Sequence, residues 1–510
     1  MTAKHILAID QGTTGSTVLV LDDRMRISGR STVDVPQHFP ADGQVEHDAE
    51  QIWAGVQRAI AAALDASRVG AKAIAAIGIT NQRETSVVWD RATGQPIHRA
   101  IVWQDRRTAD VCAKLRTAGH EPDAYASTGL LLDPYFSGTK VAWLLDHVRD
   151  ARRRAEAGDL AFGTMDTWLV HKLTGGKRHA TDVTNASRTM LMNLRSLEWD
   201  DGMLRLLGVP RAVLPEIVAS AGPIGTTHGL AALPDGIPIT GIAGDQQSAL
   251  FGQSCFSRGD VKCTYGTGAF ILMNVGTTPM MSKHRLLSTV AWKIPGETAY
   301  ALEGSAFIAG AAVQWLRDGL GIIKTAAEIE DLARSVPSSG EVVFVPALTG
   351  LGAPHWAPHA RGLITGLGRD TGRGHIARAT LEGIALSIAD LVDAMGADAG
   401  VPVASMRVDG GASANNLLME IQCALVRAEI VRPAVVETTA LGAGMLAALG
   451  AGLVPSRDAF ASLLPPDRTF SPPPDDPAVH ALRARWRAAV ARTLAPSAEP
   501  IGARSALGGQ

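Results

Sequence analysis

The chain has 510 residues, of which 46% are hydrophobic, 19% charged and 5% aromatic, and it contains 53 glycines. This length exceeds one ordinary core, so we expect two domains of similar size, and the composition excludes a mainly disordered chain. The formal net charge is −2 and long Lys/Arg runs are absent, which argues against nucleic acid or an anionic membrane as a partner and favours small molecules.

The first half of the chain alternates strand and helix patterns. Two aliphatic runs, 5–10 and 16–21, are separated by Gln-Gly-Thr-Thr-Gly and predict a hairpin. Apolar residues at helical spacing predict a helix over 49–66, and a buried strand follows over 73–80. The alternation continues in helices near 139–148 and 165–174 and a strand over 237–242. Together these elements predict α/β layers.

The pattern restarts after Phe251. Strand patterns at 260–265 and 269–275 flank a second glycine-threonine turn, and about half the chain separates this turn, at Gly266, from the first, at Gly12. A weak internal duplication is therefore plausible. The predicted organisation is a domain over 1–250, a second domain over 251–494 and a disordered tail over 495–510.

Cysteine usage and the N-terminus bear on the cellular compartment. The four cysteines are scattered, without a C-x-x-C pair or metal-ligand spacing, so we expect reduced thiols in the cytosol; they are Cys112, Cys255, Cys263 and Cys423. The N-terminus lacks the regions of a signal peptide. The longest apolar stretch, 439–454, is shorter than the ~20 residues that span a bilayer and predicts a buried helix. These features predict a cytoplasmic protein without integral membrane association.

Two glycine-threonine turns could bind phosphate. The first, 10–16, reads Asp-Gln-Gly-Thr-Thr-Gly-Ser between two strands. Its N–H and hydroxyl groups can approach phosphate oxygens, and the carboxylate at the strand end can hold hydrated Mg²⁺. Alone, this sequence could equally be an ordinary hairpin turn. The second, 264–270, repeats the same chemistry in the other half, so the two turns could hold one polyphosphate from opposite sides.

A third glycine-rich turn, 408–416, follows a short strand and opens a helix. Its paired glycines allow a flat ligand close to the backbone, and a helix N-terminus favours negative charge. A Gly-Gly pair before a helix is by itself usually only a tight turn. As the third member of an ordered set, it indicates the other end of a nucleotide site.

With these turns, the chain resembles the FGGY carbohydrate kinases over nearly its whole length. Five further motifs carry the resemblance: Asn-Gln-Arg-Glu-Thr (81–85), Trp-Gln-Asp-Arg (103–106), Asp-Pro-Tyr-Phe-Ser-Gly-Thr-Lys (133–140), Gly-Asp-Gln-Gln (244–247) and Gly-Leu-Gly-Ala-Pro (350–354). The resemblance implies an α/β fold with two ribonuclease H-like, actin-like domains, as in the sugar kinase/Hsp70/actin superfamily, and a cleft between them. It also implies ATP and Mg²⁺ as cofactors, glycerol as the phosphorylated polyol, and a homodimer or homotetramer.

The resemblance further implies roles for individual residues. Asp245 is the expected general base, because it should stand at the end of a buried strand. A small triol needs polar partners and aromatic walls; the implied pocket is Arg83, Glu84, Trp103, Tyr135, Asp245, Gln246 and Phe270. The implied nucleotide contacts are Thr13, Thr14, Gly15, Ser16, Thr267, Gly268, Gly310, Gln314, Gly411 and Asn415, with Asp10 and Asp245 for the metal.

Simpler interpretations stay open for some of these residues. Arg83 and Glu84 could form a surface ion pair, and Asp245 could cap the following helix. Rival functions are an FGGY kinase for a pentulose, a tetritol or dihydroxyacetone, and a non-catalytic actin-like sensor.

Other positions depart from the family pattern. Thr17 takes the place of the basic residue that usually follows the first turn, and Gly15 takes the place of a serine within the turn. The loop 225–236 lacks the Gly-Gly and Arg pattern that some relatives use for fructose 1,6-bisphosphate, and we expect its His228 to be solvent-exposed.

Overall fold

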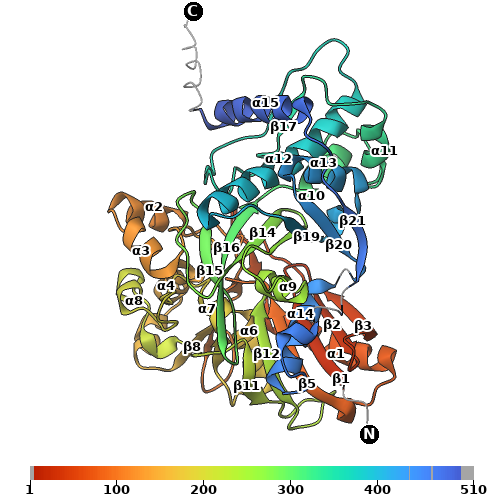
Figure 1. Ribbon diagram of the computed structural model, residues 1–510. Coiled ribbons are helices and arrows are strands. Elements are labelled where there is room, and N and C mark those ends of the chain that lie inside the picture. The colour runs from red at the N-terminus through yellow and green to blue at the C-terminus, as the bar shows by residue number, and fades with distance from the viewer. Residues whose placement is uncertain (1–4, 436, 461–462, 464, 496–510) are drawn as a thin grey trace, which may run out of the picture.

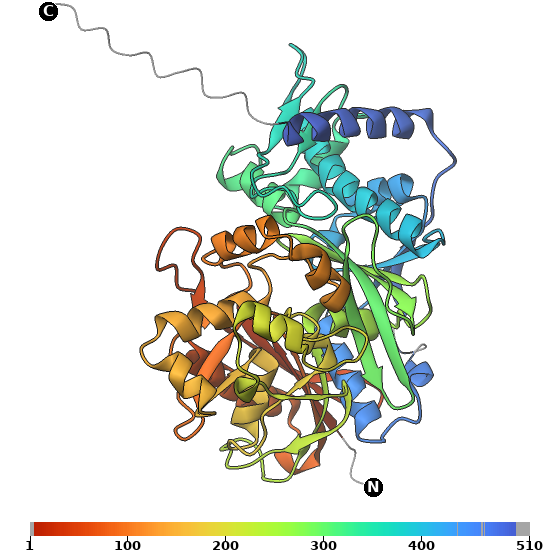
Figure 2. The same cartoon turned by 90° about the vertical axis from the view of Figure 1, so that its left-hand side faces the viewer.

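The computed structural model describes residues 5–435, 437–460, 463 and 465–495. Two mixed α/β domains lie one above the other (Figure 1), and Figure 2 shows the same stacking from the side.

A six-stranded sheet forms the centre of the first domain. Its strands are β1 (His5–Gln11), β2 (Gly15–Leu21), β3 (Ile27–Asp34), β5 (Ile74–Asn81), β11 (Ala221–Thr226) and β12 (Pro238–Gly244), in the order β11-β12-β5-β1-β2-β3. β1, β2 and β3 are antiparallel neighbours, whereas β5 is parallel to both β1 and β12. The hairpin and the strands predicted near 73–80 and 237–242 are confirmed. Most β1 and β12 residues are buried, as the aliphatic runs predict.

A seven-stranded sheet forms the second domain. Its strands are β13 (Val261–Tyr265), β14 (Ala269–Gly276), β15 (Leu287–Ile294), β16 (Glu297–Ala306), β19 (Ser405–Asp409), β20 (Glu429–Pro433) and β21 (Pro466–Phe470), in the order β15-β16-β14-β13-β19-β20-β21. β13, β14 and β16 are antiparallel neighbours, and β19 is parallel to β13 and β20. This pairing repeats that of the first sheet, as the proposed duplication predicts.

Helices cover the two sheets. In the first domain they are α1 (Ala49–Ser67), α2 (Ala109–Thr117), α3 (Glu121–Thr128), α4 (Ser137–His147), α5 (Ala151–Glu156), α6 (Met165–Leu173), α7 (Val183–Ala186), α8 (Asp201–Leu207) and α9 (Asp245–Gly252). Later in the chain come α10 (Gly310–Asp318), α11 (Glu328–Arg334), α12 (Arg373–Ala399), α13 (Asn416–Val426), α14 (Thr438–Gly450) and α15 (Pro477–Leu494). Single 3₁₀ turns occur at Ala71–Ala73, Arg211–Val213, Gly411–Ala414 and Arg457–Phe460. The helices predicted at 49–66, 139–148 and 165–174 correspond to α1, α4 and α6.

Four two-stranded ribbons complete the fold: β4 (Glu46–His47) with β7 (Ala100–Ile101), β6 (Val87–Asp90) with β8 (Leu160–Gly163), β9 (Ala180–Asp182) with β10 (Glu216–Val218), and β17 (Val343–Val345) with β18 (Leu363–Thr365).

The start and stop of α1 illustrate how local sequence sets these elements. Asp48 caps the helix by accepting the N–H groups of Glu50 and Gln51. The helix ends at Ser67, and the next residue, Arg68, adopts a left-handed conformation with φ of 56°. The apolar residues between these ends face β2 and β3 of the first sheet and bury one side of the helix.

Helix α14 belongs to the late part of the chain but packs on the first sheet. It contacts β1, β5 and β12 as well as α9, and Figure 1 shows this blue helix beside β5 and β12 in the lower domain. Glycines allow the close approach: a Cβ at Gly78 would lie 2.1 Å from the Ala443 carbonyl oxygen, and one at Gly442 would lie 1.9 Å from that of Ser248. The helix predicted to be buried at 439–454 is thus confirmed.

The boundary expected near residue 250 stays a prediction. α9 runs across this position, and the return of α14 gives the first domain a segment from far along the chain. The tail expected at 495–510 lies outside the described residues from 496 onward. The four cysteines are all buried and form no disulfide bond among the described residues, while their reduced state in the cytosol stays a prediction. Within the described parts of the chain, every helix is too short or too polar to cross a membrane.

Candidate active site

The first turn joins β1 to β2 and exposes two of its three hydroxyl groups. The Gly12 N–H donates to the Gly15 carbonyl over 2.8 Å and closes the turn. Thr13 is partly exposed and Thr14 is exposed, so both can reach a ligand. The hydroxyl of Ser16 is buried and has no hydrogen-bond partner among the described residues. The predicted contacts at this turn therefore differ in accessibility.

The second turn joins β13 to β14 and is also closed by a backbone hydrogen bond between two glycines. The Gly266 N–H donates to the Gly268 carbonyl over 2.9 Å, and Thr267 is exposed. Gly310 opens α10 and donates its own N–H to the Gly266 carbonyl over 3.0 Å. A Cβ at Gly310 would lie 2.7 Å from that oxygen, which explains the glycine. One turn later, Gln314 is exposed.

The third turn follows β19 and packs against β13. Gly410 has φ of 84°, and a Cβ there would lie 2.4 Å from the Tyr265 carbonyl oxygen. The neighbouring Gly411 is exposed. The Asn415 side chain accepts the N–H of Leu418 over 2.9 Å and so caps α13. This capping is a structural role that exists alongside the predicted nucleotide contact.

Three aromatic side chains form a wall that includes both domains. The ring centroid of Trp103 lies 5.6 Å from that of Tyr135 and 6.2 Å from that of Phe270, with edge-to-face geometry. Phe270 belongs to β14, whereas the other two precede α4 in the first domain. The indole N–H of Trp103 donates to the Thr13 hydroxyl over 2.9 Å. The predicted pocket wall thus contacts the first turn.

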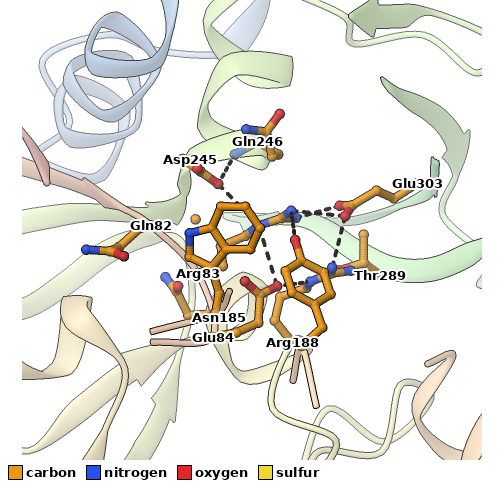
Figure 3. A network of polar contacts seen from close by, with 12 residues as sticks. Gln82, Arg83, Glu84, Asn185, Arg188, Asp245, Gln246, Thr289 and Glu303 are labelled. Carbon is orange, nitrogen blue, oxygen red and sulfur yellow. Dashed lines mark hydrogen bonds and ion pairs between the residues drawn. The ribbon is translucent and has the colours of Figure 1, made fainter. Parts of the chain in front are cut away.

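A buried network of charges lies at this wall (Figure 3). Arg83 donates to both oxygens of Glu303 over 2.5 and 3.0 Å. Arg188 donates to Glu84 over 2.7 Å and to Glu303 over 2.9 Å. The four side chains are at most 2% exposed, whereas Asp245, 3.2 Å from Arg83 Nε, is 30% exposed. The predicted base therefore lies at the accessible edge of a paired cluster.

Burial and pairing shift the protonation of the two glutamates. Burial alone would raise the pKa of Glu303, but Arg188 and Arg83 lower it below the ordinary value, so this carboxylate is ionised. Burial raises the pKa of Glu84, and the arginines offset this only in part. Glu84 also has φ of 62°, which is costly for a residue with a side chain and is typical of functional sites.

Gln246 is held by a lysine from the second domain. Lys262 of β13 is buried and donates to the side-chain oxygen of Gln246 and, over 3.0 Å, to the Thr264 hydroxyl. Burial lowers the pKa of Lys262. This bond is a second polar contact between the domains at the site.

Asp10 and Asp245 are the carboxylates that are predicted to hold a metal ion near the first turn. Burial, then the charges of Asp245 and Glu437, raise the pKa of Asp10 to about 8. Among the described residues, His, Cys, Asp and Glu side chains nowhere gather in a group of three that could hold a metal ion alone. Mg²⁺ commonly uses one or two carboxylates together with waters and substrate phosphates. The two carboxylates of Asp10 and Asp245 fit such an ion. Its positive charge would offset the repulsion between the carboxylates that raises the pKa of Asp10.

Both simpler interpretations of the site residues are wrong. Arg83 and Glu84 are buried, so they do not form a surface ion pair. Gly244 occupies the cap position of α9, and Asp245 is the first helical residue. The carboxylate of Asp245 does accept the Gln246 N–H over 2.7 Å, which leaves its second oxygen for other partners.

Two positions that depart from the family pattern, Thr17 and His228, have polar neighbours in the structure. The Thr17 and Thr32 hydroxyls lie 3.0 Å apart across two strands. His228 is exposed, as predicted, and its Nδ1 lies 2.8 Å from the Asp235 carboxylate.

Sequence reasoning missed three buried charges of the site, namely Arg188, Lys262 and Glu303. A signal was present for Lys262 and Glu303, because each is an isolated charge within a strand pattern, and a buried charge requires a partner. In β16, for example, Glu303 is the one charge after the first residue of the strand.

Two mixed sheets, each with a glycine-threonine turn between two neighbouring strands, define the sugar-kinase fold, with its two ribonuclease H-like, actin-like domains. The predicted fold class is confirmed. Family models support a narrower assignment. The chain belongs to the FGGY family of carbohydrate kinases, whose N-terminal domain model matches residues 5–252 and whose C-terminal domain model matches residues 261–451.

Relatives extend this likeness over nearly the whole chain. A glycerol kinase from Myxococcus xanthus is 56% identical over 492 residues, which cover 96% of this chain and 99% of that protein. One from Alkalilimnicola ehrlichii is 55% identical, with 96% and 98% covered. The crystal structure of Plasmodium falciparum glycerol kinase with ADP has a TM-score of 0.91 at 35% identity, covering 97% of this chain and 99% of that one. A gluconate kinase from Lactobacillus acidophilus, with a TM-score of 0.87, 23% identity and 96% and 99% covered, shares the fold.

Proposed function

We propose that the protein transfers the γ-phosphoryl group of ATP to a terminal hydroxyl of glycerol, giving sn-glycerol 3-phosphate and ADP. Relatives more than 50% identical over nearly the full chain carry the name glycerol kinase, which supports this substrate. The observation that carries the proposal is the position of Asp245: its partly exposed carboxylate lies beside the buried Arg83, next to the aromatic wall that contacts the first turn.

In the proposed step, Asp245 accepts the proton of the attacking hydroxyl as the new O–P bond forms and the bond to the ADP oxygen breaks. Arg83, Glu84 and Gln246 orient the hydroxyls of glycerol. The aromatic wall excludes water, which limits hydrolysis of ATP. This positioning supplies much of the acceleration, because phosphoryl transfer needs little covalent help from the protein.

The two glycine-threonine turns would hold the β- and γ-phosphates from opposite domains through Thr13, Thr14 and Thr267. Gly310, Gln314, Gly411 and Asn415 would line the rest of the nucleotide. Asp10 and Asp245 would hold Mg²⁺, which supplies positive charge to the phosphates when bound. We also infer a cytoplasmic location and a homodimer or homotetramer, which cell fractionation and light scattering would test.

The test is ADP release with MgATP and glycerol, dihydroxyacetone, erythritol, xylulose or ribulose, for the wild type and Asp245→Asn. We expect turnover with glycerol and a loss of at least a hundredfold in the variant, since a positioned base contributes about 10²–10⁴-fold. Asp201→Asn, an exposed change at the start of α8, is the matched control. Turnover with a pentulose alone would overturn glycerol as the substrate, and no turnover with any polyol would favour a sensor.

A further inference from the structure

One carboxylate of the buried network has no part in the proposed reaction. Glu303 lies on β16, the strand next to the β15 edge of the second sheet, and its backbone neighbours are Leu272 of β14 and Leu287 of β15. Its side chain is fully buried and accepts hydrogen bonds from Arg83 and Arg188, both of the first domain. A carboxylate from one domain thus holds two arginines from the other, as Figure 3 shows.

The geometry fixes the direction of the Arg83 guanidinium. Nη1 donates to one oxygen of Glu303 over 2.5 Å and Nη2 to the other over 3.0 Å, a forked contact that sets the plane of the group. Arg83 Nε then lies 3.2 Å from Asp245, and Nη2 lies 3.4 Å from the Tyr135 hydroxyl. The N–H groups that remain for the pocket are therefore oriented by a residue outside it.

Arg188 links Glu303 to Glu84, the other carboxylate of the pocket. It donates to Glu84 over 2.7 Å while its second contact is Glu303. Its guanidinium carbon lies 5.2 Å from the ring centroid of Phe136, so apolar packing confines it. The four charges cancel, and each arginine contacts Glu303, so loss of this carboxylate would leave both arginines without a shared acceptor.

We propose that Glu303 is a positioning residue of the second domain, which orients Arg83, and through it Asp245, to receive the polyol. The polyol pocket of the first domain is then complete only while β16 lies against it. This inference rests on the proposed function. It predicts a selective effect on the polyol, whereas an ion pair that only stabilises the fold would leave polyol affinity unchanged in the folded variant.

The first experiment compares Glu303→Gln, which keeps the shape and removes the charge, with the wild type. We expect the KM for glycerol to rise at least tenfold, while the KM for MgATP and ADP binding by calorimetry change by less than twofold. Glu297→Gln is the matched control, because Glu297 lies on the same strand and pairs with Arg457 at a distance from the site. The control should keep wild-type kinetics.

A double-mutant cycle tests whether Glu303 acts through Arg83. The loss in kcat/KM for glycerol in Arg83→Gln/Glu303→Gln should equal that of Arg83→Gln alone, within twofold. Multiplied losses, or equal rises in both KM values for Glu303→Gln, would overturn the positioning role. If Glu303→Gln does not fold, Glu303→Asp, which keeps the charge but shortens the side chain, should raise the glycerol KM at least threefold, and an unchanged KM would overturn the role.

The wild-type assay separates the two proposals. Turnover of glycerol by the wild type together with an unchanged glycerol KM in Glu303→Gln would overturn the positioning role alone. Absence of glycerol turnover in the wild type would overturn the proposed function, and the positioning role with it.

Discussion

The Trp103 indole N–H donates to the Thr13 hydroxyl over 2.9 Å, so one side chain serves as a wall of the predicted polyol pocket and as a partner of the first phosphate turn. The same indole meets Phe270 of the second domain edge-to-face. A change in one half of the proposed site can therefore reach the other half through Trp103.

Trp103→Phe keeps an aromatic wall but removes the N–H donor. A hydrogen bond contributes about 0.5–1.5 kcal/mol net, so we expect kcat/KM for both glycerol and MgATP to fall about 2–13-fold. Steady-state kinetics with each substrate varied in turn would measure this. Trp143→Phe, on α4, is the control and should change neither value. An effect on glycerol alone would show that the bond to Thr13 does not couple the two ends.

Gly442→Ala should destabilise the protein. The added Cβ would lie 1.9 Å from the Ser248 carbonyl oxygen of α9, and overpacking of this kind costs about 1–3 kcal/mol. The measurement is the free energy of unfolding in urea. Gly396→Ala is the control, because its Cβ would lie 3.4 Å from the nearest atom, the Val401 carbonyl oxygen, and alanine is the better helix former. Equal stabilities of the two variants would contradict the described packing of α14.

Asp166→Asn should alter how stability depends on pH. Burial, then the charge of Asp182, raise the pKa of Asp166 to about 7 from 3.8, while hydrogen bonds from Thr164 and Thr181 act in the opposite direction. The folded state therefore binds a proton more tightly than the unfolded state, so this group's contribution to stability is full below about pH 4 and is lost as pH rises to about 7.

The difference in unfolding free energy between Asp166→Asn and the wild type should thus grow in favour of the variant from pH 4 to 7. One pKa unit corresponds to about 1.4 kcal/mol, which bounds the change at about 4 kcal/mol. Chemical denaturation at four pH values measures it. Asp123→Asn, an exposed carboxylate on α3, should run parallel to the wild type, and a parallel course for Asp166→Asn would contradict the pKa shift.

Thr17→Arg should lower the KM for MgATP. Thr17 lies directly opposite Asp10 in the β1–β2 pair, so its side chain is on the same face as the carboxylate at the first turn. A partly exposed charge contact is worth about 0.2–1 kcal/mol, which predicts up to about a fivefold decrease. Thr32→Arg, one strand further away on β3, is the control. A KM that rises in Thr17→Arg would place the phosphates elsewhere.

Local patterns predicted much of the fold and part of the site. The hairpin of β1 and β2 followed from two aliphatic runs around a turn, the helix α1 from the spacing of its apolar residues, and the buried α14 from an apolar stretch, because neighbours in sequence determine them. The partners of α14 did not follow, since its apolar residues surround the helix and do not indicate which sheet it covers. Glu303 was missed for a related reason: its partner Arg83 is 220 residues away, a distance over which sequence spacing carries no information.

The position of α14 separates the order of synthesis from the order of assembly. A ribosome completes β1, β5 and β12 long before residues 438–450 emerge, so the nascent first sheet has one face open to water or to chaperones during most of translation. Closing that face requires six of the seven strands of the second sheet to have been made, because only β21 follows α14 in the chain, and the chain to have returned to the first sheet. The first domain to leave the ribosome is therefore completed only after most of the second domain has been translated.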